Sequence, residues 1–387
     1  MTTDSILFHL GEGTPHQSIP GSPPIYQTSN FIYETVDDMS KALEREHEEP
    51  FYTRGTNPTV QILQQKLAAL ENTSNALVFG SGSAAICTAV ISQVKAGDHI
   101  VCVDNPYGWT KKLIVDILER FNVSCTFVSA DNTAGIIQAC NENTSLIYLE
   151  SPNSWTYEMQ DLVVITAFAK QNNITTIIDN SCASPLYQKP ADHGIDIIVH
   201  SGTKYLAGHS DIVAGVLCTN HETYLSIFKS EYMSLGGIIS PNDAWLMIRS
   251  LRTLELRMEK ISQNAQPVAE YLSSHKHVER LYYTHSPYFA QRELVDKYLS
   301  SNGGLMTIDL KTNDVNQVKA ICNALNCFKL GCSWGAFESL AFPALTTISS
   351  LNYDKPNTPI NRIRLSIGLE NAETLIADLD NAFKTLD

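Results

Sequence analysis

A lysine beside two hydroxyl groups is the most reactive feature of the sequence. Residues 197–211 read IIVHSGTKYLAGHSD, where a strand pattern ends at His200 and is followed by Ser201, Thr203 and Lys204. A lysine at a strand end can form a Schiff base with pyridoxal phosphate, and the neighbouring hydroxyls would bind the phosphate. A surface lysine in a turn explains this segment equally well when it is taken alone.

An acidic residue ends the preceding strand pattern. Residues 175–185, TTIIDNSCASP, place Asp179 at the end of a buried strand. An isolated carboxylate there is costly unless it is paired, and a pyridinium N–H is a suitable partner that makes the ring an electron sink. The alternative is an N-cap for the next turn. Asp179 and Lys204 fall at successive strand ends, which favours the cofactor interpretation.

A Gly/Ser turn leads into a helical pattern at residues 78–86, VFGSGSAAI. The backbone N–H groups of Gly82 and Ser83, together with the helix dipole, make an anion site. The dinucleotide motif G-x-G-x-x-G and the Walker A motif are both missing from the sequence, so a single phosphate fits better than a pyrophosphate.

Alternating strand and helix patterns must position these residues. The strand patterns cover residues 76–80, 99–103, 125–129, 146–150, 175–179, 196–200 and 215–219. Several are near-continuous apolar runs, which predict strands buried on both faces. The alternation predicts an α/β fold with a mostly parallel, doubly wound, seven-stranded sheet that binds ligands at the carboxyl ends of its strands.

The chain divides into three predicted parts. Residues 1–57 are rich in Pro and Gly, and Pro23 and Pro24 oppose a helix, so we expect an extended arm that lies on a neighbouring subunit. Residues 58–250 form the predicted cofactor-binding domain. Residues 251–387 form a smaller predicted α+β domain, with helical patterns at 251–274 and 370–386 and a strand pattern at 303–311.

The charge balance limits the partners. The 387 residues include 27 Lys plus Arg and 41 Asp plus Glu, a net charge of −14, which disfavours nucleic acid and anionic membranes. No secretion signal and no membrane-length apolar run are visible. The nine scattered cysteines predict a reduced, cytoplasmic protein without disulfides. Cys322, Cys327 and Cys332 match no zinc spacing, so no metal is expected.

Together these segments resemble the pyridoxal-phosphate enzymes of cysteine and methionine metabolism, the transsulfuration family. The resemblance extends over more than 340 residues, through PPIYQTSNF, YTRGTNPT, GSGSAA, NPYG, LESP, DNS, HSGTKYLAGHSD, SWGAFESL and IRLSIGLE. It implies the aspartate-aminotransferase-like fold type I, pyridoxal 5'-phosphate as cofactor, a sulfur amino acid as substrate, and a homotetramer built as a dimer of dimers.

The resemblance also implies roles for individual residues. Lys204 would be the Schiff-base lysine, Asp179 would pair the pyridine nitrogen, and Tyr107 would stack on the ring, with a pKa lowered by cationic neighbours and the cofactor. Phosphate binding would fall to Gly82, Ser83, Ser201 and Thr203, with Tyr52 and Arg54 reaching the site of the adjacent subunit. Substrate binding would fall to Arg364 for the carboxylate, helped by Ser333, Trp334, Tyr52 and Ser154.

Four positions bear on the reaction. Cys332 stands at a position where typical γ-lyases and γ-synthases have an acidic residue. Phe51 stands where γ-lyases often have an acidic residue, and Trp109 stands where methionine γ-lyases have a cysteine. Ser-Trp-Gly, with Trp334, resembles bacterial cystathionine β-lyases. The resemblance therefore implies α,β-elimination of L-cystathionine to homocysteine, pyruvate and ammonia. YTRGTNPT and DNSCASP look more like the γ-lyase branch, so methionine γ-lyase, cystathionine γ-lyase and γ-synthase stay as alternatives.

Two other classes of function are compatible with parts of the sequence. Ser201 to Lys204 match the Ser-x-x-Lys motif of penicillin-binding acyltransferases, but the companion strings S-D-N and K-T-G do not occur. A non-catalytic protein that stores pyridoxal phosphate on the same fold is the other possibility. Such a protein could lose Arg364 or Tyr107, and because both are present we favour an enzyme.

Overall fold

The apolar runs between residues 75 and 219 form one seven-stranded sheet in the computed structural model, which describes residues 1–12, 20–348 and 359–386. In spatial order the strands are β1 (Asn75–Phe79), β7 (Gly215–Thr219), β6 (Ile197–Ser201), β5 (Thr175–Asp179), β4 (Thr144–Glu150), β2 (His99–Val103) and β3 (Ser124–Val128). β7 runs antiparallel to β1 and β6, and the other pairs are parallel. The predicted mostly parallel α/β sheet is confirmed.

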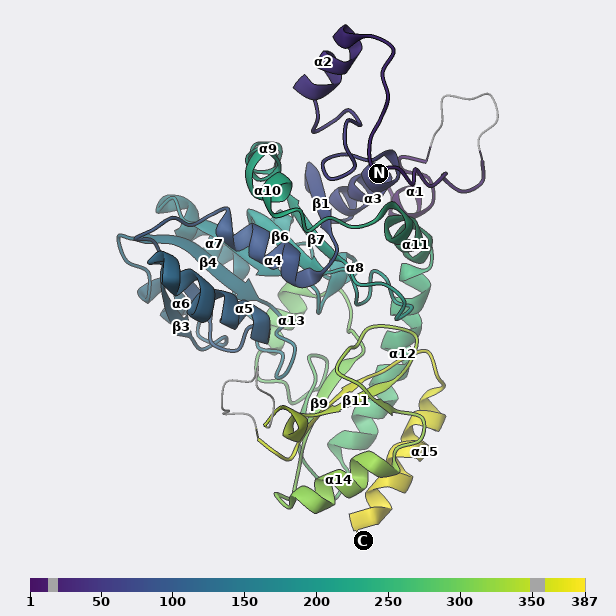
Figure 1. Cartoon of the computed structure of the whole chain (residues 1–387). Coiled ribbons are helices and arrows are strands. Elements are labelled where there is room, and N and C mark those ends of the chain that lie inside the picture. Colours follow the sequence, from purple (N-terminus) through teal and green to yellow (C-terminus); the bar gives the residue numbers. More distant parts are fainter. Residues whose placement is uncertain (13–19, 349–358, 387) are drawn as a thin grey trace.

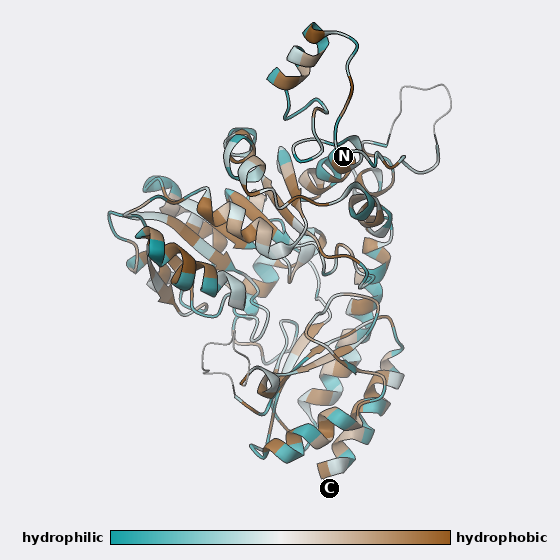
Figure 2. Ribbon diagram, viewed as in Figure 1, coloured by the Kyte–Doolittle hydropathy of each residue, from teal (hydrophilic) through white to brown (hydrophobic). Residues whose placement is uncertain are grey.

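Helices connect and cover these strands. They are α3 (Pro58–Leu70), α4 (Gly82–Ile91), α5 (Gly108–Lys112), α6 (Thr133–Gln138), α7 (Leu162–Gln171), α8 (Ser184–Tyr187), α9 (His221–Ile227), α10 (Met233–Leu235) and α11 (Pro241–Leu251). α4 packs against β1, β6 and β7. Every residue of β2 and β7 is buried, as expected for strands covered on both faces. Figure 2 shows hydrophobic residues along the strands.

A second sheet of five strands lies in the C-terminal part. Its order is β10 (Lys329–Leu330), β11 (Leu340–Pro343), β12 (Arg362–Ser366), β9 (Leu305–Leu310) and β8 (Val278–Tyr282). The helices here are α12 (Leu254–Ser273), α13 (Arg292–Tyr298), α14 (Val315–Ala324) and α15 (Ala372–Phe383). This sheet has its own hydrophobic cluster, and α12 runs from the first part of the molecule into the second (Figure 1). The boundaries at 57 and 250 stay predictions.

The N-terminal part contains two helices that the sequence analysis did not predict. In α1 (Thr3–Phe8), the Thr2 side chain accepts the N–H of Ser5, and the buried Lys66 donates to the carbonyls of Ile6 and Leu7 at 2.9 and 3.2 Å. α2 (Val36–Glu44) is capped by Thr35. Side-chain caps and one buried lysine therefore stabilise short helices despite the nearby prolines.

α2 stands away from the rest of the ribbon in Figure 1. Its apolar side chains Val36, Met39 and Leu43 are exposed, and the preceding Ile32 is 93 % exposed. The spacing of three and four residues places these α2 side chains on one face of the helix. Within the described residues this face has no apolar cover. The packing of the arm on a neighbouring subunit stays a prediction.

β7 approaches the turn before α4 so closely that position 215 has room only for glycine. A Cβ built at Gly215 would overlap the carbonyl oxygen of Ser81 and lie 2.9 Å from the Cβ of Ala85. We expect Gly215→Ala to displace this turn and lower the free energy of unfolding by about 1–3 kcal/mol in urea denaturation. The control is Gly21→Ala, where a Cβ meets nothing within 4 Å. Equal midpoints for the two variants would contradict the steric argument.

Candidate active site

The carboxyl ends of β4, β5 and β6 bring the first group of site residues together. Glu150 and Asp179 are register partners on β4 and β5, and Asp179 is paired with Val199 on β6. Ser201 at the end of β6 donates its N–H to the Ser181 hydroxyl at 2.6 Å. Because the parallel strands end at one edge, residues far apart in sequence meet there.

Asp179 is a buried carboxylate that accepts a hydrogen bond from the backbone. Its Oδ1 accepts the N–H of Ser181 at 2.9 Å, and the residue is 6 % exposed. Burial raises the pKa of Asp179, while bonds from Ser181 and the charges of His200 and Lys204 oppose that rise. Among the described residues Asp179 has no ion pair, so a cationic nitrogen of a ligand would satisfy it.

Lys204 lies in the turn that follows β6. Its backbone N–H donates to the carbonyl of Ser201 at 3.1 Å. Its Nζ is 2.9 Å from the hydroxyl of Ser333 and 5.5 Å from the ring centre of Trp334. Burial, and then the charge of Arg364, lower the pKa of Lys204 to about 8. A free amine is therefore available near neutral pH, as a Schiff-base lysine requires.

The turn before α4 lies against the end of β6. The Ser81 hydroxyl accepts the N–H of Ala84 at 3.1 Å, which leaves Gly82 and Ser83 at the start of the helix. A Cβ at Gly82 would lie 3.0 Å from the Cα of Ser201. The Thr203 hydroxyl instead bonds the backbone of residue 214 at 3.0 and 3.2 Å. The turn, Ser201 and Thr203 thus lie close together, with Thr203 already engaged.

Tyr107 immediately precedes α5 and is 42 % exposed. Its backbone N–H donates to Glu150 Oε2 at 2.7 Å. Burial raises the pKa of Tyr107, and a hydrogen bond with Ser83 lowers it less. In the chain alone the pKa of Tyr107 thus moves upward, because burial of the phenol outweighs its neighbours. The lowering expected with the cofactor bound stays a prediction.

Arg364 is a buried cation on β12 without a carboxylate partner among the described residues. Nη1 donates to the carbonyl of Ser154 at 3.1 Å, and Nη2 donates to the carbonyl of Cys332 at 3.0 Å. Its guanidinium carbon is 5.0 Å from the ring centre of Trp155 and 5.3 Å from that of Phe342. A guanidinium held in this way can still receive a carboxylate.

Tyr52 and Arg54 lie apart from the residues around Lys204. They line a hollow of about 420 Å³ together with residues 27–29 and 238–241, and Arg54 lies over the ring of Tyr52 at 5.4 Å. Within the described part of the chain, no hydrogen bond or ion pair joins either residue to Lys204. Their predicted contribution to a neighbouring subunit stays a prediction.

A family model described as "Cys/Met metabolism PLP-dependent enzyme" matches residues 4–384. The chain belongs to this family. It is 36 % identical to an L-methionine γ-lyase of Fusobacterium nucleatum over 94 % of this chain and 93 % of that protein. It is also 36 % identical to a cystathionine β-lyase of Lactococcus lactis over 98 % of each chain.

The solved structures agree with this membership. Cystathionine γ-lyase from Lactobacillus plantarum, solved in complex with L-serine, superimposes with a TM-score of 0.91 at 32 % identity, over 100 % of this chain and 99 % of that one. The fold is that of the type I PLP enzymes, and PLP is the cofactor. The chain is thus an enzyme of the PLP-dependent carbon–sulfur lyase family.

The residues of this lyase fit PLP in their chemistry. A buried carboxylate without a counterion, Asp179, suits the ring nitrogen, and a largely buried amine, Lys204, suits the aldehyde. The helix N-terminus at Gly82 and Ser83, with Ser201 beside it, suits a phosphate. Within the described residues, no helix has both the length and the hydrophobicity to cross a membrane, and no metal-binding group of His, Cys, Asp or Glu occurs.

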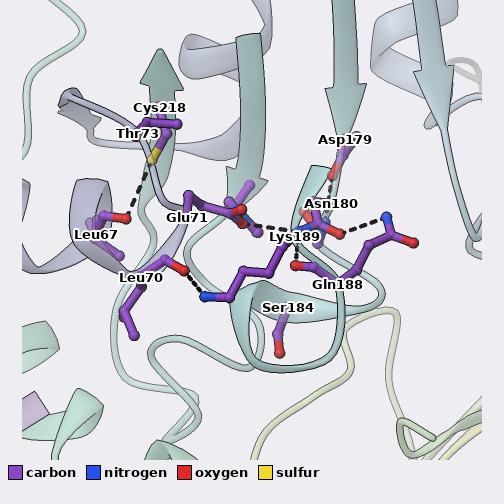
Figure 3. Close-up of polar contacts among 12 residues, drawn as sticks. Leu67, Leu70, Glu71, Thr73, Asp179, Asn180, Ser184, Gln188, Lys189 and Cys218 are labelled. Atoms are coloured by element: carbon purple, nitrogen blue, oxygen red, sulfur yellow. Dashed lines mark hydrogen bonds and ion pairs between the residues drawn. The ribbon is translucent and has the colours of Figure 1, made fainter. Parts of the chain in front are cut away.

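A second buried network lies beside Asp179 and was missed by the sequence analysis (Figure 3). Glu71 Oε1 lies 2.5 Å from His200 Nε2 and accepts from Asn180 Nδ2 at 2.9 Å. The Gln188 side chain donates to Asn180 Oδ1 and to the carbonyl of Ser151. The network fixes the segment that follows β5. Its members are spread over the sequence, so no local motif reveals it.

The pKa of Lys204 gives a pH prediction. Below pH 8 a growing fraction of the amine is protonated and cannot attack an aldehyde, so the rate at which cofactor-free enzyme captures added PLP should fall about tenfold per pH unit. In Arg364→Met the neighbouring cation is gone, and the inflection should move upward by less than about one unit. Stopped-flow absorbance measures both. An inflection that stays near 10.5, the ordinary value for lysine, would contradict the burial of this amine.

Proposed function

We propose that this enzyme cleaves L-cystathionine by α,β-elimination to homocysteine, pyruvate and ammonia. The observation that carries the proposal is the segment Cys332-Ser333-Trp334 beside Lys204. Ser333 bonds the Lys204 amine and Trp334 lies against it, while position 332 offers a thiol in place of the acid typical of γ-lyases. A γ-elimination needs a further proton taken from Cβ, and an acid here would favour it.

PLP, when bound, supplies an electron sink that acidifies the Cα proton of an amino acid. In our proposal Lys204 removes that proton, with its amine oriented by the Ser333 hydroxyl at 2.9 Å. Asp179 would hold the ring nitrogen protonated, and Tyr107 would stack on the ring. The phosphate would bind to the main chain of Gly82 and Ser83 and to the hydroxyl of Ser201. The Thr203 hydroxyl would join them only by giving up its bond to the carbonyl of residue 214.

Substrate recognition would centre on Arg364. The guanidinium lacks a counterion within the described chain, and the carbonyls of Ser154 and Cys332 hold it. It lies close enough to Lys204 for its charge to lower the pKa of that amine. A bidentate bond to the substrate carboxylate would complete its hydrogen bonding. Ser333 and Trp334 would then lie between this anchor and Lys204, where the reacting bonds must be.

We further propose that the active site is completed by a second copy of the chain, in a homotetramer built as a dimer of dimers. Tyr52 and Arg54 line a hollow of their own, and the exposed apolar face of α2 is continuous with their arm. Arg54 would reach the phosphate and Tyr52 the substrate of the neighbouring subunit. All nine cysteines are unpaired, in agreement with the cytoplasmic location that we propose.

Elimination at the γ-carbon is the second candidate reaction. The similarity to the L-methionine γ-lyase of Fusobacterium nucleatum, at the same 36 % identity as the β-lyase, favours it. L-Methionine would then yield 2-oxobutyrate. The two reactions differ in their keto acid, and that product distinguishes them.

The keto acid produced by purified enzyme tests the reaction. With L-cystathionine we expect pyruvate to exceed 2-oxobutyrate by at least about tenfold, because a tenfold preference needs a difference of only about 1.4 kcal/mol between the two barriers. Mass spectrometry identifies the products, and L-methionine serves as the second substrate. Cys332→Glu should raise the share of 2-oxobutyrate. Predominant 2-oxobutyrate from the wild type would make the enzyme a γ-lyase.

Mixed subunits test the shared site. Arg54→Ala and Arg364→Ala should each lose most activity, because one loses a phosphate contact and the other the carboxylate anchor. Co-expressed, they form hybrid dimers in which one of the two sites is intact, so purified hybrid dimers should recover about half of the wild-type activity. Activity is measured on hybrids purified through two different tags. No recovery in verified hybrids would mean that each chain builds its own site.

A further inference from the structure

Glu150 ends β4 and has no role in the function proposed so far. The residue is 4 % exposed, and its carboxyl accepts two backbone N–H groups. Oε2 accepts from Tyr107 at 2.7 Å and Oε1 accepts from Ser154 at 3.0 Å. The two oxygens of one side chain thus join two segments that are more than 40 residues apart.

The contacts of Ser154 extend this connection to the second sheet. Its carbonyl accepts Nη1 of Arg364 on β12 at 3.1 Å. A continuous chain of hydrogen bonds therefore runs from the backbone of Tyr107, through the Glu150 carboxyl and the backbone of Ser154, to the guanidinium of Arg364. Tyr107 lies between β2 and α5, and Arg364 lies on β12 of the second sheet. Each is joined to this path by a hydrogen bond.

The turn that follows Glu150 is held by several hydrogen bonds, so a displacement of one end of the turn would also displace the groups that contact Arg364. Asn153 Oδ1 accepts the N–H groups of Trp155, Thr156 and Tyr157 at 2.9–3.0 Å. The Trp155 ring in turn lies 5.0 Å from the guanidinium carbon of Arg364. A shift of Ser154 would therefore move both the carbonyl and the ring that hold Arg364.

We propose that Glu150 is a positioning residue that sets the distance between Tyr107 and Arg364. It would thereby hold the substrate carboxylate in register with the cofactor ring. This inference rests on the roles proposed for Tyr107 and Arg364 but not on the choice between β- and γ-elimination. Geometry of this kind matters for rate, because a displacement of about 1 Å of a bound substrate can cost about 10²-fold.

The pKa of Glu150 depends on the same two backbone contacts. Burial and then the charge of Asp179 raise its pKa to about 8, and the bonds from Tyr107 and Ser154 oppose the rise. The other ionisable groups whose pKa values respond to Glu150 are Cys102, Tyr107, Tyr148, Cys182 and Arg364. The two N–H groups that Glu150 binds are therefore also the contacts that stabilise its carboxylate against burial.

Two variants of the holoenzyme test the proposal. Glu150→Met keeps the length of the side chain and removes both acceptors. Glu150→Gln keeps one acceptor and replaces the other with a donor. We expect KM for L-cystathionine to rise at least about tenfold in Glu150→Met and about threefold or more in Glu150→Gln, since each lost acceptor leaves a buried N–H unpaired.

Two readouts do not depend on turnover. The induced circular dichroism of bound PLP near roughly 420 nm should weaken as the Tyr107 ring shifts. The dissociation constant of L-alanine, which has a carboxylate but no leaving group, should rise in parallel with KM when followed by cofactor absorbance. The control is Gln160→Met, which removes an equally buried side chain that donates to the carbonyl of Ala130 at 2.8 Å. It should lose stability and leave both readouts unchanged.

The outcomes separate the possibilities. Lower thermal stability with wild-type KM, dichroism and L-alanine affinity in Glu150→Gln would overturn the proposal and leave Glu150 a structural residue. If Glu150→Met does not fold, Glu150→Gln decides alone by the same readouts. A wild-type protein that binds no PLP would instead refute the proposed function, and the dichroism of the wild type reveals that before any variant is made.

Discussion

Burial of charge without a counterion is the constraint on which this site depends. Asp179 and Arg364 are buried, Lys204 is largely buried, and none has an ion pair within the described residues. Desolvation raises the pKa of the acid and lowers those of both bases. Such charges are costly unless a partner arrives. A ring nitrogen, an aldehyde and a carboxylate are the three groups that would relieve them.

The molecule holds these charges in place with neutral groups. Strand ends and backbone N–H groups fix Asp179, one hydroxyl orients Lys204, and two carbonyls with two aromatic rings hold Arg364. Neutral hydrogen bonds also join the parts of the chain that carry the two sheets, among them Lys204 with Ser333 and Tyr157 with Thr307 at 3.1 Å. Neutral supports keep the charges reactive, because a permanent counterion would compete with the ligand.

The sequence predicted the first sheet well and the second poorly, for a physical reason. Strands buried on both faces are continuous apolar runs, so all seven patterns lie within two residues of the observed bounds. In the second sheet β8 has two exposed residues and β10 has only two residues, so neither forms such a run. The capped helices α1 and α2 were missed because the prolines of that region outweighed the caps.

Residues at strand ends were also the ones that sequence reasoning could find. Lys204 and Asp179 were identified as side chains that follow buried strands. The same argument applied to the strand pattern at residues 146–150 (LIYLE) would have identified Glu150, whose carboxyl likewise ends a buried strand. Trp155 and Phe342, by contrast, meet Arg364 only through the tertiary fold, and the Glu71–His200 network joins residues 129 apart. No spacing rule anticipates such contacts.

The projecting α2 has a consequence for how the enzyme responds to its own concentration. Exposure of an apolar helix face to water is unfavourable, and docking of a second chain would bury that face and lower the free energy. If that chain also completes the site, assembly and PLP retention are thermodynamically linked, and each depends on protomer concentration by mass action. Dilution would then lower activity by dissociating the subunits, and excess cofactor would favour their assembly.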